Sequence, residues 1–158
     1  MAWETEIVEQ VRVVINDTES PQTYTDTRIE RATIIAAAQA VKEIDFSRVY
    51  SVDITLQTIS PDPTGLDPKD LDFINLVSLK CACIILGGEL RQYSLSSVTV
   101  VDGPSTMSFG SIFRNLKDTL EGLLKQYDKA KFLYQSGISG QCITTPTTAI
   151  NIYPSQEF

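Results

Sequence analysis

Residues 67–93 read DPKDLDFINLVSLKCACIILGGELRQY, and this stretch decides the fold. Across residues 71–86 the apolar side chains cover most of the circumference of a helix. A helix that is apolar nearly all round is buried on every side. In a chain of 158 residues such a helix must lie at the centre of the molecule. Asp67 as N-cap and Pro68 at the first helical position predict where it begins.

Two shorter helices are predicted before the central one. Residues 4–16 carry apolar side chains at the i, i+3, i+4, i+7 spacing of an amphipathic helix. A second helix begins near Thr25 or Asp26, either of which is a good N-cap. Thr27 and Glu30 offer an alternative capping box for the same helix. The second helix is rich in alanine, which is small enough for another helix to approach closely, so helix packing is expected on that face.

A fourth helix is predicted from Gly110 or Ser111 to a stop at Gly137. Its apolar residues recur at intervals of three and four, a heptad seam suited to docking on a bundle. The seam consists of Phe113, Leu116, Leu120, Leu123, Tyr127, Ala130 and Tyr134. Together these segments predict a mainly α protein, a small helical bundle of about four helices.

Short β elements are predicted at two places. Residues 48–59 are rich in strand-forming side chains, with Val52, Ile54 and Leu56 on one face. Residues 98–109 are typical of a short hairpin around an Asp-Gly-Pro turn. The expected bundle therefore has a short β-hairpin or strand element attached.

The last 22 residues, 137–158, differ from the rest because Glu157 is their one charged residue. An extended arm that adds its backbone and alternate side chains to a partner surface explains this composition; a frayed terminus is the alternative. The expected anchors on a portal or neighbouring subunit are Ile143, Ile150, Ile152, Tyr153 and Phe158. We therefore divide the chain into a helical domain, residues 1–136, and an extended C-terminal arm.

The formal net charge of −7 is concentrated in the first half of the chain. Residues 1–72 carry 14 acidic and 6 basic side chains, whereas residues 73–158 carry 6 and 7. Tight DNA binding is not expected, because affinity for phosphates comes from Lys and Arg, although an acidic wall would let DNA slide past. We expect no signal segment, and the longest apolar run, residues 81–86, is too short to span a membrane.

Groups suited to catalysis are few. The chain has no histidine, which removes the commonest general base and transition-metal ligand. Cys81 and Cys83 are expected to be small buried side chains, and together with Cys142 they fit a reducing compartment. The one metal hypothesis is a Mg²⁺ site of four carboxylates, on Asp62, Asp67, Asp70 and Asp72. Because helix-start electrostatics explains two of these acids, we expect no enzymatic activity, no cofactor and no metal.

Several pieces of the sequence, taken in order, resemble the head–tail connector (adaptor) proteins of tailed bacteriophages. The pieces are residues 11–18 (VRVVINDT), 24–26 (YTD), an alanine-rich helix, 67–68 (DP), a long helix ending in 88–90 (GEL), 101–106 (VDGPST), and a last helix with Leu120 and Tyr127. The resemblance covers about residues 7–135 and is carried by the order and spacing of the pieces. Residues 48–59 and the last 22 residues have no counterpart in it.

The resemblance implies a structural virion protein of the phage neck, assembled in the host cytoplasm. In that family the subunit is a small helical bundle with a hairpin, and copies form a ring, usually twelvefold, below the portal. The implied partners are the portal protein, a tail or stopper or terminator protein, and further copies of the chain. Genomic DNA would pass through the ring without specific binding.

Two other functions stay open. The chain could be another virion part, such as a neck or tail-completion protein. In a different class, it could be an acidic binding module that mimics DNA. A mimic would form a salt-sensitive complex with a basic nuclease or polymerase.

Overall fold

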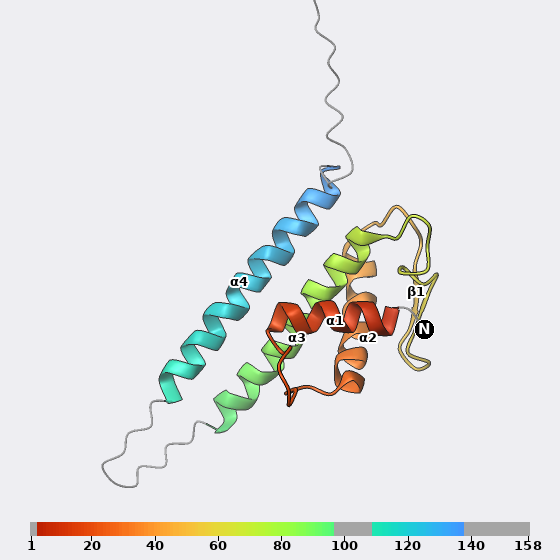
Figure 1. The fold of residues 1–158 in the computed structure, drawn as a ribbon. Helices are drawn as coiled ribbons and strands as arrows, with labels where there is room; N and C mark the ends of the chain where they lie inside the picture. Colours follow the sequence, from red (N-terminus) through yellow and green to blue (C-terminus); the bar gives the residue numbers. More distant parts are fainter. Residues whose placement is uncertain (1–2, 97–108, 138–158) are drawn as a thin grey trace, which may run out of the picture.

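The computed structural model describes residues 3–96 and 109–137, and Figure 1 shows how their elements are arranged. The elements are α1 (Trp3–Ile15), α2 (Asp26–Glu43), β1 (Ser51–Asp53), β2 (Thr58–Ser60), α3 (Leu71–Ser96) and α4 (Phe109–Gln135). The predicted mainly α bundle with a small β element is confirmed. The hairpin predicted at residues 98–109 lies outside the described residues, except for Phe109, which begins α4.

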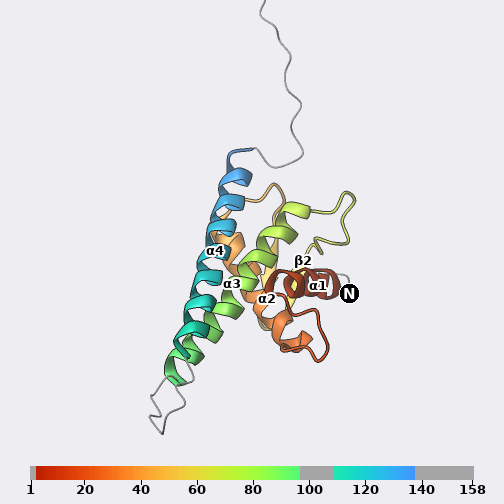
Figure 2. The same cartoon turned by 60° about the vertical axis from the view of Figure 1, so that its left-hand side comes forward.

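Helix α3 lies at the centre, with α1 and α2 on one side and α4 on the other (Figure 2). Phe73 and Val77 are fully buried in a cluster with α1, α2 and the hairpin. Leu76 and Ala82 belong to a second cluster, formed with α4 and the end of α2. The predicted central position of this helix is therefore confirmed.

The central helix is also long and apolar enough to cross a membrane by length and composition. Although its longest unbroken apolar run is short, a window within Leu71–Ser94 has a mean hydropathy of 1.7. Within the bundle, 56% of that window is buried. A core helix packed by neighbours on several sides has the same composition, so this property does not indicate a membrane span.

Helix α3 begins just after Asp70, and the prediction of a start at Asp67 and Pro68 is wrong. The Oδ1 atom of Asp70 accepts a hydrogen bond from the Phe73 N–H at 3.0 Å. The Tyr50 hydroxyl donates to the other oxygen of Asp70 at 2.6 Å. Both acids could cap a helix, but Asp70 is the one whose carboxylate is held by a tyrosine from outside the helix.

Residues 48–59 do not place Val52, Ile54 and Leu56 on one face of a strand, and the prediction of that shared face is wrong. Antiparallel β1 and β2 pair as a hairpin, with Val52 opposite Ile59. Ile59 is buried, but Ile54 and Leu56 lie between the strands and are 59% and 71% exposed. Val52, Ile54 and Leu56 are thus separated, because the chain reverses direction between the two strands.

The reversal is produced by Asp53. Its Oδ1 atom accepts hydrogen bonds from the N–H groups of Thr55 and Leu56, at 2.8 and 2.9 Å. An aspartate that binds backbone N–H groups two and three residues ahead stabilises a turn. Gln57 completes the turn with a positive φ of 53°.

Helix α2 begins as predicted. Thr25 is the N-cap, and its hydroxyl accepts a hydrogen bond from the Arg28 N–H at 3.3 Å. The alternative capping box at Thr27 and Glu30 is not used, since both lie inside the helix. The predicted packing stripe is fully buried at Ala36, Ala37 and Ala40.

Helix α4 runs antiparallel to α3 along its outer side (Figures 1 and 2). Leu123 and Tyr127 are buried, and four other seam residues pack against the same cluster, namely Leu116, Leu120, Ala130 and Tyr134. Phe113 is 37% exposed, so the predicted seam is confirmed from Leu116 onward. Gly137 ends the helix as predicted, with a φ of 68° that favours glycine.

Candidate functional site

Two of the four carboxylates of the magnesium hypothesis, those of Asp62 and Asp70, take part in local hydrogen bonds. Asp62 accepts hydrogen bonds from the N–H and the hydroxyl of Thr64, at 3.0 and 2.7 Å. Asp70 caps α3 and binds Tyr50. Within residues 3–96 and 109–137, no group of three or more metal-binding side chains could hold an ion.

The cysteines of α3 are buried, as predicted. Burial raises the pKa of Cys81 to about 12, although the hydrogen-bonded hydroxyl of Thr33, 3.4 Å away, acts in the opposite direction. Burial also raises the pKa of Cys83. Both thiols are protonated at neutral pH and so lack the thiolate that nucleophilic chemistry requires. Cys142 lies outside the described residues.

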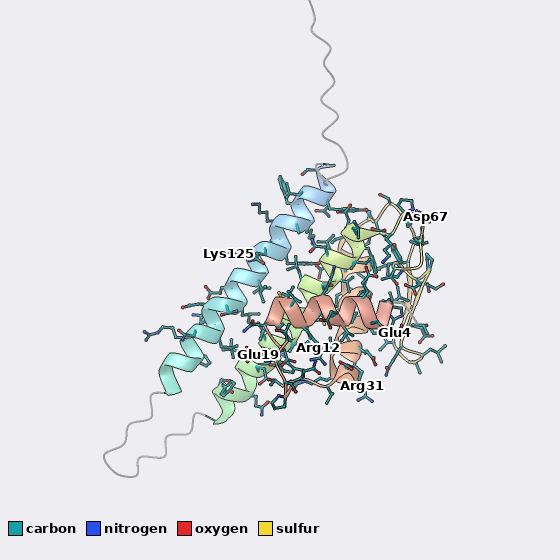
Figure 3. The ribbon with its side chains drawn as sticks, viewed as in Figure 1. Glu4, Arg12, Glu19, Arg31, Asp67 and Lys125 are labelled. Carbon is teal, nitrogen blue, oxygen red and sulfur yellow. The ribbon has the colours of Figure 1, made fainter. Side chains whose placement is uncertain are left out.

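A charge network around the buried Arg12, which is labelled in Figure 3, joins the end of α1 to the start of α2. Arg12 is 2% exposed, and its guanidinium donates to Asp17 Oδ2 at 2.8 Å. It also donates to the Tyr24 carbonyl at 3.0 Å and pairs with Asp26. Asp17 in turn accepts the N–H groups of Thr23 and Tyr24, at 2.7 and 3.1 Å. The buried Arg12 thus ties Asp17, Tyr24 and Asp26 together between the two helices.

The electrostatic balance of Asp17 favours its charged form. Burial by itself would raise the pKa of this carboxyl. The hydrogen bonds from Thr23 and Tyr24, together with the charge of Arg12, outweigh burial and hold the pKa below its ordinary value of 3.8. Asp17 is therefore ionised at neutral pH, and its buried carboxylate is hydrogen-bonded.

A second polar network, the Glu43 junction, joins α2, α3 and α4. Glu43 at the end of α2 accepts hydrogen bonds from Lys80 Nζ of α3 at 2.8 Å and from the Tyr127 hydroxyl of α4 at 2.9 Å. Lys131 Nζ lies 3.5 Å from the same carboxylate. The Lys80 ammonium also lies 4.7 Å from the centre of the Tyr127 ring. The junction holds α4 against the rest of the bundle.

The neighbours of Glu43 in this junction likewise favour its charged form. Burial would raise the pKa of Glu43, but the hydrogen bonds and charges of its neighbours lower it below its ordinary value of 4.5. Burial, followed by the hydrogen bond to Glu43, raises the pKa of Tyr127. At neutral pH the tyrosine is therefore a neutral donor and Glu43 a charged acceptor, which is the stronger form of this hydrogen bond.

An open groove of about 510 Å³ lies between α1 and α3. It is lined by Thr5, Glu6, Glu9, Gln10, Val13, Val14, Asn75 and Ser78. Val13 is 62% exposed there. The Ser78 hydroxyl donates to Gln10 Oε1 at 3.0 Å and so bridges the two helices across the groove. The groove thus has an apolar floor with acidic side chains beside it.

The outer face of α4 also exposes large apolar side chains. Leu124 and Phe132 are 43% and 66% exposed. Lys125 and Lys129 lie beside them and are exposed as well. Figure 3 places Lys125 on the side of α4 that faces away from α1. This face is therefore unpartnered in the single chain.

Sequence patterning missed the groove and predicted a site elsewhere. The predicted anchors of the arm, Ile143, Ile150, Ile152, Tyr153 and Phe158, lie outside the described residues. The available signal for the groove was Val13, an apolar residue that does not belong to the buried stripe of Ile7 and Val11. An exposed apolar residue on an otherwise polar helix face is a mark of an interaction surface only when several gather together.

Comparisons of the chain with protein-family models, with curated proteins and with solved structures found no match.

Proposed function

We propose that this chain is a structural subunit of the neck of a tailed bacteriophage. Copies of it would form an oligomeric adaptor ring between portal and tail, around the channel through which DNA passes. The observation that carries the proposal is the Arg12 network. Its hydrogen bonds join the two sequence pieces on which the family resemblance begins, residues 11–18 and 24–26, around the buried Arg12.

The Arg12 network matters because motif residues scattered on a surface would be a weak basis for a resemblance. Here Arg12 and Asp17 from the first piece contact Tyr24 and Asp26 from the second. Their order and spacing are thus constrained by one three-dimensional arrangement. The later pieces also have structural roles, since Leu120 and Tyr127 pack α4 onto the central helix.

The charge distribution and the arm fit the same role. The acidic first half of the chain, 14 acidic against 6 basic side chains, repels phosphate and suits a ring through which DNA slides without specific binding. The arm, residues 137–158, has one charge and several apolar anchors, which suits docking on a portal or a neighbouring subunit. Neither feature calls for a cofactor or a reaction.

Electron microscopy of virions that carry this chain tests the proposal. We expect a ring of its density between the portal and the tail. Density elsewhere in the neck or tail would favour the tail-completion alternative. If the chain is absent from the virion and forms a salt-sensitive complex with a basic nuclease or polymerase, the DNA mimic is favoured.

The arm gives a biochemical test with purified portal particles. Deletion of residues 141–158 should leave the melting of the bundle nearly unchanged and abolish binding to the portal. A full-length control with Ile150→Ser, Ile152→Ser and Phe158→Ser keeps the backbone and removes the anchors. If the control also fails to bind, the side chains anchor the arm. If the deletion melts the isolated chain instead, the arm belongs to the core of its own subunit and the docking hypothesis fails.

A further inference from the structure

We propose that copies of this chain associate head to tail, with the outer face of α4 from one copy seated in the α1–α3 groove of the next. The inference rests on the proposed ring and identifies the surfaces that would build it. The occupant of the groove is thus a second copy of this chain.

The groove offers an apolar floor with acidic residues beside it. Val13 is 62% exposed in the single chain, so its side chain contributes nothing to the bundle core. Glu6 and Glu9 line the groove on the α1 side. Because Glu6 already pairs with Lys69 at 2.7 Å, exposed Glu9 is the acid best placed to meet a new basic partner.

The outer face of α4 has the complementary character. Leu124 and Phe132 expose apolar surface, and Lys125 and Lys129 flank them. Asp128 lies between the two lysines, so this stretch keeps a net positive charge. An acidic groove and a basic ridge attract each other and determine the register in which they dock.

The two surfaces also match in length. Leu124 and Phe132 are eight residues apart, which is about 12 Å along a helix at 1.5 Å per residue. Glu6 and Val13 are seven residues apart on α1, which is about 10 Å by the same measure. One pair of apolar side chains on α4 can therefore span the groove from end to end.

The arrangement of the surfaces decides the symmetry. The groove lies between α1 and α3, whereas Lys125 of α4 faces away from α1 (Figure 3). A contact between two different surfaces is heterologous, and it generates a closed ring or an open filament. A two-fold dimer would instead bring identical patches together. The C-terminal arm is a poorer occupant, because residues 138–158 contain no basic side chain to meet Glu9.

Disulfide cross-linking tests this contact in the full-length chain. Val13→Cys and Phe132→Cys are made separately on a Cys142→Ser background, which leaves only the buried Cys81 and Cys83. Both substituted residues are exposed, and circular dichroism checks that each variant melts like its parent. The variants are oxidised alone and as a mixture at about 1 mM, a concentration that populates even a contact of millimolar affinity.

We expect a covalent dimer in the mixture, with mass spectrometry locating the bond between positions 13 and 132. A chain that carries both cysteines should give a ladder of oligomers. Val49→Cys is the matched control, since Val49 is 92% exposed but belongs to neither surface. Cross-linking of each single variant to itself, equal cross-linking with the control, or none at all would overturn the proposal.

Charge reversal provides a second readout. Glu9→Lys should reduce cross-linking at least about fivefold, because like charges across an interface are unfavourable. Lys129→Glu in the partner should restore it, and the same pair can be followed by sedimentation without any added cysteine. Failure of this rescue counts against the proposed register. A neck ring seen by microscopy without the 13–132 bond would refute this contact and leave the proposed function standing.

Discussion

Replacing Tyr127 with Phe removes one hydroxyl from the Glu43 junction and leaves the aromatic ring in place. The ring is 3% exposed, so its packing against α3 should persist. The lost interaction is the 2.9 Å hydrogen bond to the Glu43 carboxylate. Hydrogen bonds to charged groups contribute about 1.5–3 kcal/mol. Because Lys80 and Lys131 still hold the carboxylate, we expect the lower end, about 1.5 kcal/mol.

For a chain of this size, each kcal/mol shifts the melting temperature by about 3 °C, so Tyr127→Phe should lower it by about 4–5 °C. Thermal unfolding followed by circular dichroism measures the shift. The matched control is Tyr134→Phe, one heptad later on the same helix. The Tyr134 hydroxyl accepts from the Ser47 N–H at 2.7 Å in an exposed setting, where water can replace it. Its loss should cost less than about 0.5 kcal/mol.

The difference between the melting-temperature shifts of the two variants tests whether the Glu43 carboxylate strengthens the hydrogen bond. Equal shifts would mean that the Glu43 carboxylate adds nothing to the bond, and an unchanged melting temperature for Tyr127→Phe would mean that the Tyr127 hydroxyl contributes nothing to holding α4. A double-mutant cycle with Glu43→Gln separates the pair, and we expect a coupling of about 1 kcal/mol.

Three further predictions concern the core and the charged pairs. Leu79→Asp should abolish cooperative thermal unfolding, because it buries an unpaired carboxylate at a position that is 8% exposed; Leu124→Asp, at a position 43% exposed, is the control that should fold. Asp17→Asn should cost about 2–3 kcal/mol in urea unfolding, since it leaves the buried Arg12 with fewer charged partners; a change below about 0.5 kcal/mol, typical of surface positions, would contradict the role of the Arg12 network. The folded-state pKa values of Asp17 and Glu43 lie below their ordinary 3.8 and 4.5, so the unfolded chain takes up protons first as the pH falls. The stability that these two ionised groups contribute is therefore complete above about pH 4.5 and is lost in more acidic solution. Glu43→Gln should weaken the fall of the melting temperature below that pH, and calorimetry across pH measures this fall.

Several elements could be predicted from the sequence because their signals are local. The apolar circumference of residues 71–86 requires burial on all sides, whatever the neighbours are. The alanine stripe of α2 and the three-and-four spacing of α4 each describe one face of one helix. Thr25 caps α2 through an N–H three residues away. In each case the residues that make the element also carry the information that predicts it.

The candidate surfaces could not be predicted in the same way. Val13 belongs to a helix whose periodicity predicts only the buried face, and the groove exists because α1 crosses α3 at that place. Residues 6, 9, 75 and 78 line it together, although they come from helices separated by α2 and the hairpin. Helical spacing does not predict which side chains meet where two helices cross.

The sequence by itself determined the fold class, the central helix and the faces of α2 and α4, because helical periodicity is a property of consecutive residues. Only the tertiary structure decided which of two competing helix caps is used. Asp67 and Asp70 are both good helix caps, and Asp70 is the one that receives the Tyr50 hydroxyl. Likewise, the Glu43 junction joins residues that are up to 88 positions apart. Such contacts depend on how the helices are placed around the core, and that placement follows from packing the whole chain.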